Sequence, residues 1–175
     1  MAFLVSCWCQ RKWNPHPCGY YGDAKRECRC GSRAIEKYRQ KISGPLLDRI
    51  DIHVEVPLVD FKELSSSELG EKSATIRARV AAARELQTQR FAKNKGVSIN
   101  AAMSAKLVRE HCALDATSTS YLEHAMESMN FSARAHDRIL KVARTIADLA
   151  GCEKIQSEHI LEAIQYRSLD RKLFG

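Results

Sequence analysis

The 175-residue sequence lacks the patterns that most directly reveal an enzyme's chemistry. It has no G-x-x-x-x-G-K-[ST] loop, no G-x-G-x-x-G turn and no apolar run ending in paired acids, so we expect no triphosphate hydrolysis by this chain unaided. No Ser-His-Asp or Cys-His arrangement stands out. No apolar run reaches the length of a bilayer-spanning helix, and the short apolar start lacks the features of a secretion signal. We therefore expect a cytoplasmic protein without a membrane partner.

The composition is that of a globular protein with a basic balance. Apolar residues make up 45% of the chain and charged residues 28%, enough apolar residues for a real core and too little charge for disorder. The length suits one domain of ordinary size, or a small domain joined to a fragment. The net charge of +7 favours anionic partners such as nucleic acid, nucleotide or a membrane surface. Composition does not choose among these, and a basic surface without a specific partner also fits.

Five of the seven cysteines lie within the first 30 residues. Because the sequence has no secretion signal, clustered cysteines indicate metal binding before disulfides. The two remaining cysteines, Cys112 and Cys152, fall in helical stretches and are expected to be small core residues. The clustered cysteines are Cys7, Cys9, Cys18, Cys28 and Cys30.

Two short knuckles within this cluster offer four side chains suited to a metal. His16-Pro-Cys18 is followed after nine residues by Cys28-Arg-Cys30. Imidazole and thiolate groups in a short, loop-rich segment predict tetrahedral zinc held by His16, Cys18, Cys28 and Cys30. Cys7 and Cys9 form a similar pair and are competing candidates for zinc ligands. The alternative is a set of reduced, unliganded thiols in a poorly ordered segment.

The region before the helical part of the chain predicts an incomplete α/β unit. Residues 32–57 predict a helix, a short turn and a strand, because apolar and polar residues alternate over Ile52–Val56 before Pro57. The run Ser65–Gly70 predicts a linker. One short strand is not stable alone, and this chain barely supplies partners for it. The mismatch indicates a piece of something larger.

Four helices joined by short loops are predicted over the rest of the chain, which would make a bundle. Each has apolar residues at helical spacing, and Asp115, Ser132 and Ser157 are suited to begin three of them. The first helix has Ile76, Val80 and Ala83 on one face with arginines over much of the remainder. The predicted helices cover residues 73–93, 115–129 and 132–150, and the last begins at 157.

Two groups of basic residues are candidates for phosphate contacts. Arg49 follows a Ser-Gly-Pro turn and lies just before the predicted strand, where an arginine can be aimed at a neighbour's phosphate. The alternative there is an ordinary surface pair with Asp48. Arg134, Arg138 and Lys141 share one face at the start of a helix, where backbone N–H groups also favour an anion. The alternative is a solvated basic stripe opposite the core.

Several ordered motifs together resemble the ComM-type magnesium-chelatase-like family of AAA+ ATPases. The resemblance runs from about residue 14 to the end, and His16 stands where the family usually has cysteine. The motifs that carry it are Asn14–Asp23 (NPHPCGYYGD), Arg26–Cys30 (RECRC), Ile42–Asp51 (ISGPLLDRID), Gly70–Arg77 (GEKSATIR), Leu140–Leu149 (LKVARTIADL) and Ala163–Arg171 (AIQYRSLDR).

The resemblance implies a mainly α chain in which an incomplete α/β remnant of an AAA+ core precedes a four-helix lid. It implies a core remnant over residues 1–57 with a cysteine-rich segment at 14–31, a linker over 58–72 and the lid over 73–175. Asn14 resembles the sensor-1 asparagine, and Arg49 resembles the arginine finger that acts on the adjacent subunit's nucleotide. Arg134 resembles the sensor-2 arginine, which contacts the nucleotide of its own subunit, and Arg138 shares its face.

The function implied by the resemblance is that of a ring-shaped, ATP- and Mg-dependent motor that remodels DNA. The family is linked to natural transformation and to branch migration, and the ring is expected to be a hexamer. The part represented by this chain is expected to be inactive as an ATPase alone. The alternative is a non-enzymatic, zinc-stabilised basic module that binds nucleic acid or a protein partner.

Overall fold

A computed structural model describes residues 16–20, 23, 26–41, 43, 46, 48–54 and 70–167. The chain divides into two compact units, a smaller one within residues 1–43 and a larger one within residues 44–173. No helix in the described ranges has the length and apolar character needed to cross a membrane.

The smaller unit contains a turn followed by one helix. The backbone N–H of Gly19 donates to the carbonyl of His16 at 3.0 Å, and Gly19 has a φ of 77°, a conformation that glycine adopts without strain. The helix α1 (Ser32–Arg39) buries none of its residues. Burial of its own apolar surface therefore contributes little to holding this unit together.

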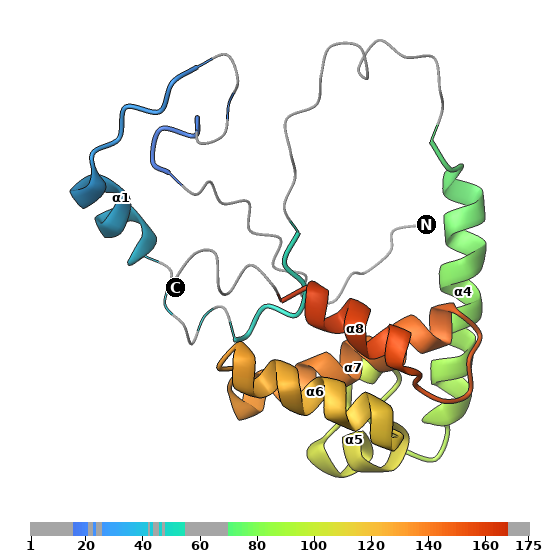
Figure 1. The fold of residues 1–175 in the computed structure, drawn as a ribbon. Coiled ribbons are helices and arrows are strands. Elements are labelled where there is room, and N and C mark those ends of the chain that lie inside the picture. Colours follow the sequence, from blue (N-terminus) through green and yellow to red (C-terminus); the bar gives the residue numbers. More distant parts are fainter. Residues whose placement is uncertain are drawn as a thin grey trace. The chain divides into compact units, whose positions relative to one another are not determined.

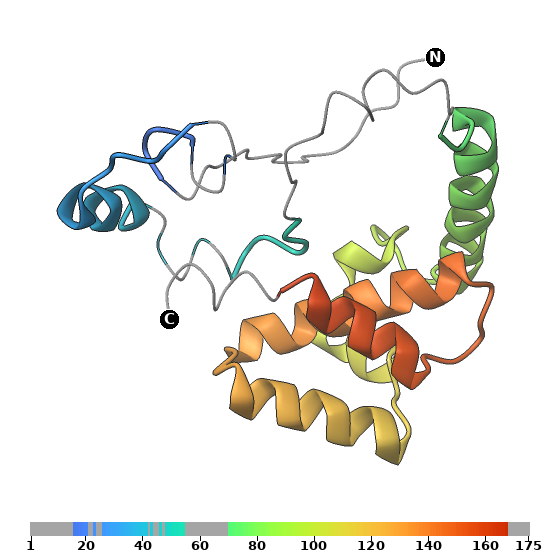
Figure 2. The ribbon, with the colours of Figure 1, turned by 45° about the horizontal axis from the view of Figure 1, so that its top comes forward.

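The larger unit is a helical bundle, described without a gap over residues 70–167 (Figures 1 and 2). Helix α7 is central, because it packs against α4, α5, α8 and the short 3-10 helix η1. Helix α8 also packs against α6. The elements are α4 (Ser73–Arg90), η1 (Asn100–Ala102), α5 (Ala105–His111), α6 (Ala116–Ser128), α7 (Ala133–Leu149) and α8 (Ser157–Gln165).

Side-chain caps fix where three of the bundle's helices begin. Ser104, Asp115 and Ser132 each accept a hydrogen bond from a backbone N–H of the first turn of α5, α6 and α7, which satisfies a donor that has no partner within the helix. The N–H of Ser118 donates to Asp115 at 2.7 Å and lowers the pKa of that carboxyl. Helix α7 ends before Gly151, whose φ of 70° continues the chain in the left-handed region.

The core of the bundle forms where the helical periodicities of α7 and α8 meet. Ile139 and Ala143 of α7 and Ile160 of α8 are completely buried, as their spacing predicts. Cys112 is buried in the same core, whereas Cys152 is only partly buried against it. The prediction for Cys112 is confirmed.

Three details of the sequence-based fold are wrong. Residues 70–167 contain five α-helices and not four, because the seven-residue helix α5 is too short to show a periodic pattern. Ile52–Val54 is not part of a strand, and no strand occurs among the described residues to pair with it. Ile76 and Val80 were expected to face the core but are 41% and 44% exposed, because the N-terminal half of α4 extends beyond the other helices (Figure 1). The mainly helical character is confirmed.

Candidate functional site

Arg134 lies in the first turn of α7, where the sequence predicts an anion contact. Ser132 caps this turn, because its Oγ accepts a hydrogen bond from the N–H of Ala135 at 3.2 Å. Arg134 is exposed and has no hydrogen bond or ion pair with any residue that the structure describes. The guanidinium and the helix N-terminus therefore present positive potential at the same place.

The two other basic residues of this face already have partners. The Arg138 guanidinium forms an ion pair with the carboxylate of Asp51. Lys141 Nζ donates to the carbonyl of Ala101 at 3.2 Å. Of the three basic residues of this face, Arg134 is the one without a hydrogen bond or ion pair to the described residues.

Arg49 is exposed at a turn whose neighbouring residues are anchored to the bundle. Its own N–H donates to the carbonyl of Leu46 at 3.0 Å. The flanking carbonyl of Ile50 accepts from Arg167 at 2.8 Å, and the N–H of His53 donates to the carbonyl of Tyr166 at 2.7 Å. The carboxylate of Asp48 lies 3.9 Å from the guanidinium of Arg167, at ion-pair distance.

Arg167 is the residue of this region that sequence reasoning missed. It is 1% exposed and is the largest of the fully buried side chains. Helical spacing gave no clear signal for it, because Arg167 lies seven residues after the buried Ile160 but beyond the end of α8 at Gln165. A buried arginine requires specific partners.

Three of the four predicted zinc ligands come together in the smaller unit, and the fourth, His16, lies beside one of them. The sulfur atoms of Cys18, Cys28 and Cys30 all lie within 4.8 Å of one another, and Cys18 Sγ and Cys28 Sγ are 3.5 Å apart. His16 Nδ1 lies 3.0 Å from Cys28 Sγ. Sulfur ligands about 2.3 Å from a tetrahedral zinc ion would be separated by roughly 3.8 Å, so the three thiols fit such an ion with little movement.

The immediate surroundings of this cluster also fit a metal. Desolvation, and then the charge of Arg39, lowers the pKa of His16, which favours the neutral imidazole that binds metals. The backbone N–H of Tyr20, 3.4 Å from Cys18 Sγ, lowers the pKa of that thiol. Cys18, Cys28 and Cys30 are all free thiols.

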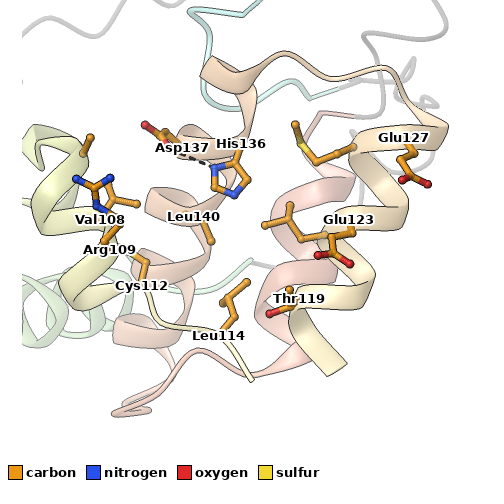
Figure 3. A pocket seen from close by; sticks show the side chains of 13 residues that line it. Val108, Arg109, Cys112, Leu114, Thr119, Glu123, Glu127, His136, Asp137 and Leu140 are labelled. Atoms are coloured by element: carbon orange, nitrogen blue, oxygen red, sulfur yellow. Dashed lines mark hydrogen bonds and ion pairs between the residues drawn. The ribbon is translucent and has the colours of Figure 1, made fainter. Parts of the chain in front are cut away.

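A separate groove in the bundle is formed by α5, α6 and α7 (Figure 3). Its apolar floor includes Leu140, and Arg109 lies on the opposite side from Glu123. His136 lies 3.2 Å from the carboxylate of Asp137 at its rim. None of the predicted site residues lines this groove.

Three residues of the sequence-based site lie outside the described residues. These are Asn14 and the competing ligands Cys7 and Cys9. Most of the predicted linker also falls there, since residues 55–69 are not described. Their predicted roles therefore stay predictions.

Two family models together match most of the chain. Residues 70–167 match the model described as magnesium chelatase, subunit ChlI C-terminal. Residues 2–64 match the model described as magnesium chelatase, subunit ChlI. The boundary between the two matches falls just before the helical bundle.

Curated relatives agree with these models. The chain is 39% identical to competence protein ComM of Haemophilus influenzae and 40% identical to protein YifB of Escherichia coli, in each case over 161 residues, 91% of this chain. It is 33% identical to protein Mb2921c of Mycobacterium bovis over 154 residues, 88% of this chain. In all three comparisons the matched part is 30% of the relative's length. The chain belongs to the magnesium chelatase ChlI family and, within it, to the ComM/YifB type.

Proposed function

We propose that the whole protein is an ATP-driven motor that remodels DNA, and that this chain forms the end of its AAA+ core and its helical lid. The observation that carries the proposal is the exposure of two arginines, Arg49 and Arg134, which resemble the arginine finger and the sensor-2 arginine of the family. The name of the Haemophilus influenzae relative supports a role in competence, and branch migration of DNA is the activity that we propose. The net charge of +7 suits a DNA partner.

The two arginines have different proposed roles. Arg134 contacts the nucleotide of its own subunit, where its guanidinium and the capped start of α7 both favour phosphate. Arg49 acts on the nucleotide of the adjacent subunit in a ring, which we propose to be a hexamer. Arg138 shares the face of Arg134, but its pairing with Asp51 suits it better to holding the Arg49 segment than to binding phosphate. Asn14 keeps its proposed role as the residue that positions water.

ATP and Mg²⁺ are cofactors of the proposed whole protein and not of this chain alone. The sequence contains neither the loop that cradles phosphates nor the acid that holds magnesium. We therefore propose that the chain by itself does not hydrolyse ATP. We place the motor in the cytoplasm, because free, clustered thiols suit a reducing compartment.

The test uses a completed ATPase, defined here as the upstream part of the Haemophilus influenzae relative joined to this chain. Arg49→Ala should lower turnover on the order of 10³-fold and leave ATP affinity nearly unchanged. Arg134→Ala should weaken ATP binding itself. Arg84→Ala is the matched control, since Arg84 is an exposed arginine on α4. Equal effects of Arg49→Ala and Arg84→Ala on turnover would remove the proposed role of Arg49.

We also propose that His16, Cys18, Cys28 and Cys30 bind one zinc ion that holds the smaller unit together. The close approach of the three sulfurs supports the proposal, as does the absence of any buried residue in α1. A unit with so little core requires another source of stability. The family match gives no support to the alternative of a free-standing zinc module, and the zinc site is proposed as a part of the motor.

The metal proposal is tested by elemental analysis of the chain purified under reducing, chelator-free conditions. About one zinc per chain is expected. Cys28→Ser should release the ion and increase hydrogen exchange over residues 26–41, while the exchange of α7 and α8 stays unchanged. Cys152→Ser is the matched control, because Cys152 lies in the helical bundle. Wild-type protein without bound zinc would overturn the proposal.

A further inference from the structure

Arg167 is a buried cation that contacts a segment far away in the sequence. It is 1% exposed, and Nη1 donates to the carbonyl of Ile50 at 2.8 Å across 117 positions of the chain. Nη2 lies 3.9 Å from Oδ1 of Asp48. The guanidinium carbon lies 5.8 Å from the centre of the Phe131 ring, so an aromatic face also stabilises the charge. Burying a guanidinium is costly unless its contacts are specific, and two of the polar contacts here fall within the short segment 48–50.

Two of the contacts of Arg167 fall on the residues immediately before and after Arg49. The side chain of Asp48 and the backbone carbonyl of Ile50 are both held by the same guanidinium, while Arg49 itself is exposed. An arginine suits this arrangement because one nitrogen of its planar fork donates to the carbonyl of Ile50 while the other faces the carboxylate of Asp48 at ion-pair distance, whereas a lysine ammonium is a single point charge. The backbone on either side of Arg49 is thereby fixed to the end of α8.

Two further contacts tie the same segment to the bundle. Asp51 pairs with Arg138 of α7, and the N–H of His53 donates to the carbonyl of Tyr166 at 2.7 Å. Arg138 is one helical turn from Arg134 on α7. The Arg49 segment and Arg134 are therefore attached to the same rigid element.

We propose that Arg167 is a positioning residue for Arg49. Arg167 fixes the backbone around Arg49, so that the Arg49 side chain keeps a constant position relative to Arg134 on α7. This inference rests on the proposed function of Arg49. Arg167 does not touch nucleotide in this proposal and acts only through the segment that it holds. It makes the Arg49 segment a part of the lid, so that a movement of α7 is transmitted to Arg49.

The first test follows hydrogen exchange in the 175-residue chain. Arg167→Lys keeps the charge but removes the fork, and it should accelerate exchange of the Arg49 and His53 amides at least about tenfold, while the core amides of α7 stay protected. Arg109→Lys, on an exposed arginine of α5, is the matched control and should change neither. Exchange that accelerates equally throughout the bundle, or nowhere, overturns the proposal.

A second variant keeps this test decisive if Arg167→Lys does not fold. Asp48→Asn removes only the carboxylate contact to the same guanidinium and leaves Arg167 in place. It should accelerate exchange of the Arg49 amide by a smaller factor than Arg167→Lys, and again without effect on the core of α7. An Arg49 amide that exchanges at the wild-type rate in Asp48→Asn counts against the proposal.

The second test measures turnover in the completed ATPase. Arg167→Lys should lower kcat as Arg49→Ala does, with KM for ATP unchanged, because the segment acts on the neighbouring subunit's nucleotide. If Arg49→Ala lowers kcat and Arg167→Lys does not, the positioning role is wrong. If Arg49→Ala itself leaves kcat unchanged, the proposed function of Arg49 is wrong, and hydrogen exchange alone decides whether Arg167 fixes the segment.

Discussion

Arg90 and Asp148 form a partly buried ion pair that joins α4 to α7 across 58 positions of the chain. Arg90 Nη1 donates to Asp148 Oδ2 at 2.8 Å, and the second nitrogen of the fork contacts Oδ1. The same carboxylate accepts from Asn100 Nδ2 at 2.8 Å and from Arg144 Nε at 3.1 Å. One fully buried carboxylate therefore satisfies donors from α4, η1 and α7.

The first prediction concerns the loss of that carboxylate. Asp148→Asn leaves two guanidinium groups without their anion, and we expect it to lower the free energy of unfolding of the bundle by about 3 kcal/mol. Urea denaturation of the chain followed by helical circular dichroism measures the change. Glu71→Gln is the matched control, because it breaks an exposed pair with Arg79 at 3.0 Å and should cost less than about 1 kcal/mol. If both variants lower the free energy of unfolding by a similar amount, burial does not make the Asp148 contacts more stabilising than an exposed ion pair.

The second prediction is a dependence of stability on pH. Burial alone raises the pKa of Asp148, but hydrogen bonds from Arg90 and Asn100 and the charge of Arg144 outweigh it, so the pKa lies below its ordinary value. The unfolded state therefore binds a proton before the folded state as the pH falls. The stability that Asp148 contributes is complete above the ordinary carboxyl pKa of about 3.9 and is lost as the pH falls from there through the folded pKa.

Urea denaturation between about pH 6 and about pH 2.5 checks this dependence across the carboxyl range. The wild-type free energy of unfolding should fall in the acid part of this range, and the Asp148→Asn curve should be flatter. Some slope should persist in the variant, because the pKa of Asp115 is also lowered. Parallel curves for wild type and Asp148→Asn would contradict the prediction.

The third prediction concerns the reactivity of the cysteines in the bundle. Burial raises the pKa of Cys112 to about 11, so roughly one thiol in a thousand is ionised at pH 8, and the thiolate is the reactive form. Iodoacetamide should label the partly buried Cys152 well before Cys112 in the folded chain, as read by mass spectrometry of tryptic peptides. Both should react at similar rates in urea. Equal rates in the folded chain would show that Cys112 is not enclosed as described.

The sequence predicted the helices of the bundle best where a buried face repeats along a long helix. The face of α7 that includes Ile139 and Ala143 is an example, because its pattern is maintained through the 17 residues of α7. The same reasoning was wrong for Ile76 and Val80 of α4. Periodicity reports which face of a helix is apolar, but only the packing of other elements decides whether that face is covered.

Buried charges were the part of the molecule that sequence reasoning could not predict. Asp148 and Arg167 look like surface residues in the sequence, and their burial depends on partners that are 58 and 117 positions away. The proposed metal ligands were easier to find, because Cys18, Cys28 and Cys30 lie within 13 positions of one another. Local spacing therefore identified the thiol cluster, whereas contacts made through the fold required the structure.

The fourth prediction asks whether Arg49 acts across a subunit boundary. Two inactive variants of the completed ATPase are required, Arg49→Ala and a variant of the lysine in the upstream phosphate-binding loop. In a mixed ring, some interfaces bring an intact Arg49 from one subunit to an intact loop in the next. Because an arginine finger stabilises charge that develops in the transition state, those interfaces should hydrolyse ATP, and turnover should partly return on mixing.

The control for this experiment is a mixture in which both defects are placed in the same subunit and that subunit is diluted with Arg49→Ala. Such a ring contains no intact Arg49, so its turnover should stay at the level of the separate variants. Co-assembly of each mixture is checked by affinity capture of one tagged variant with the other. If the first mixture remains inactive although the rings have assembled, Arg49 does not act on the neighbouring subunit, and its assignment as an arginine finger is wrong.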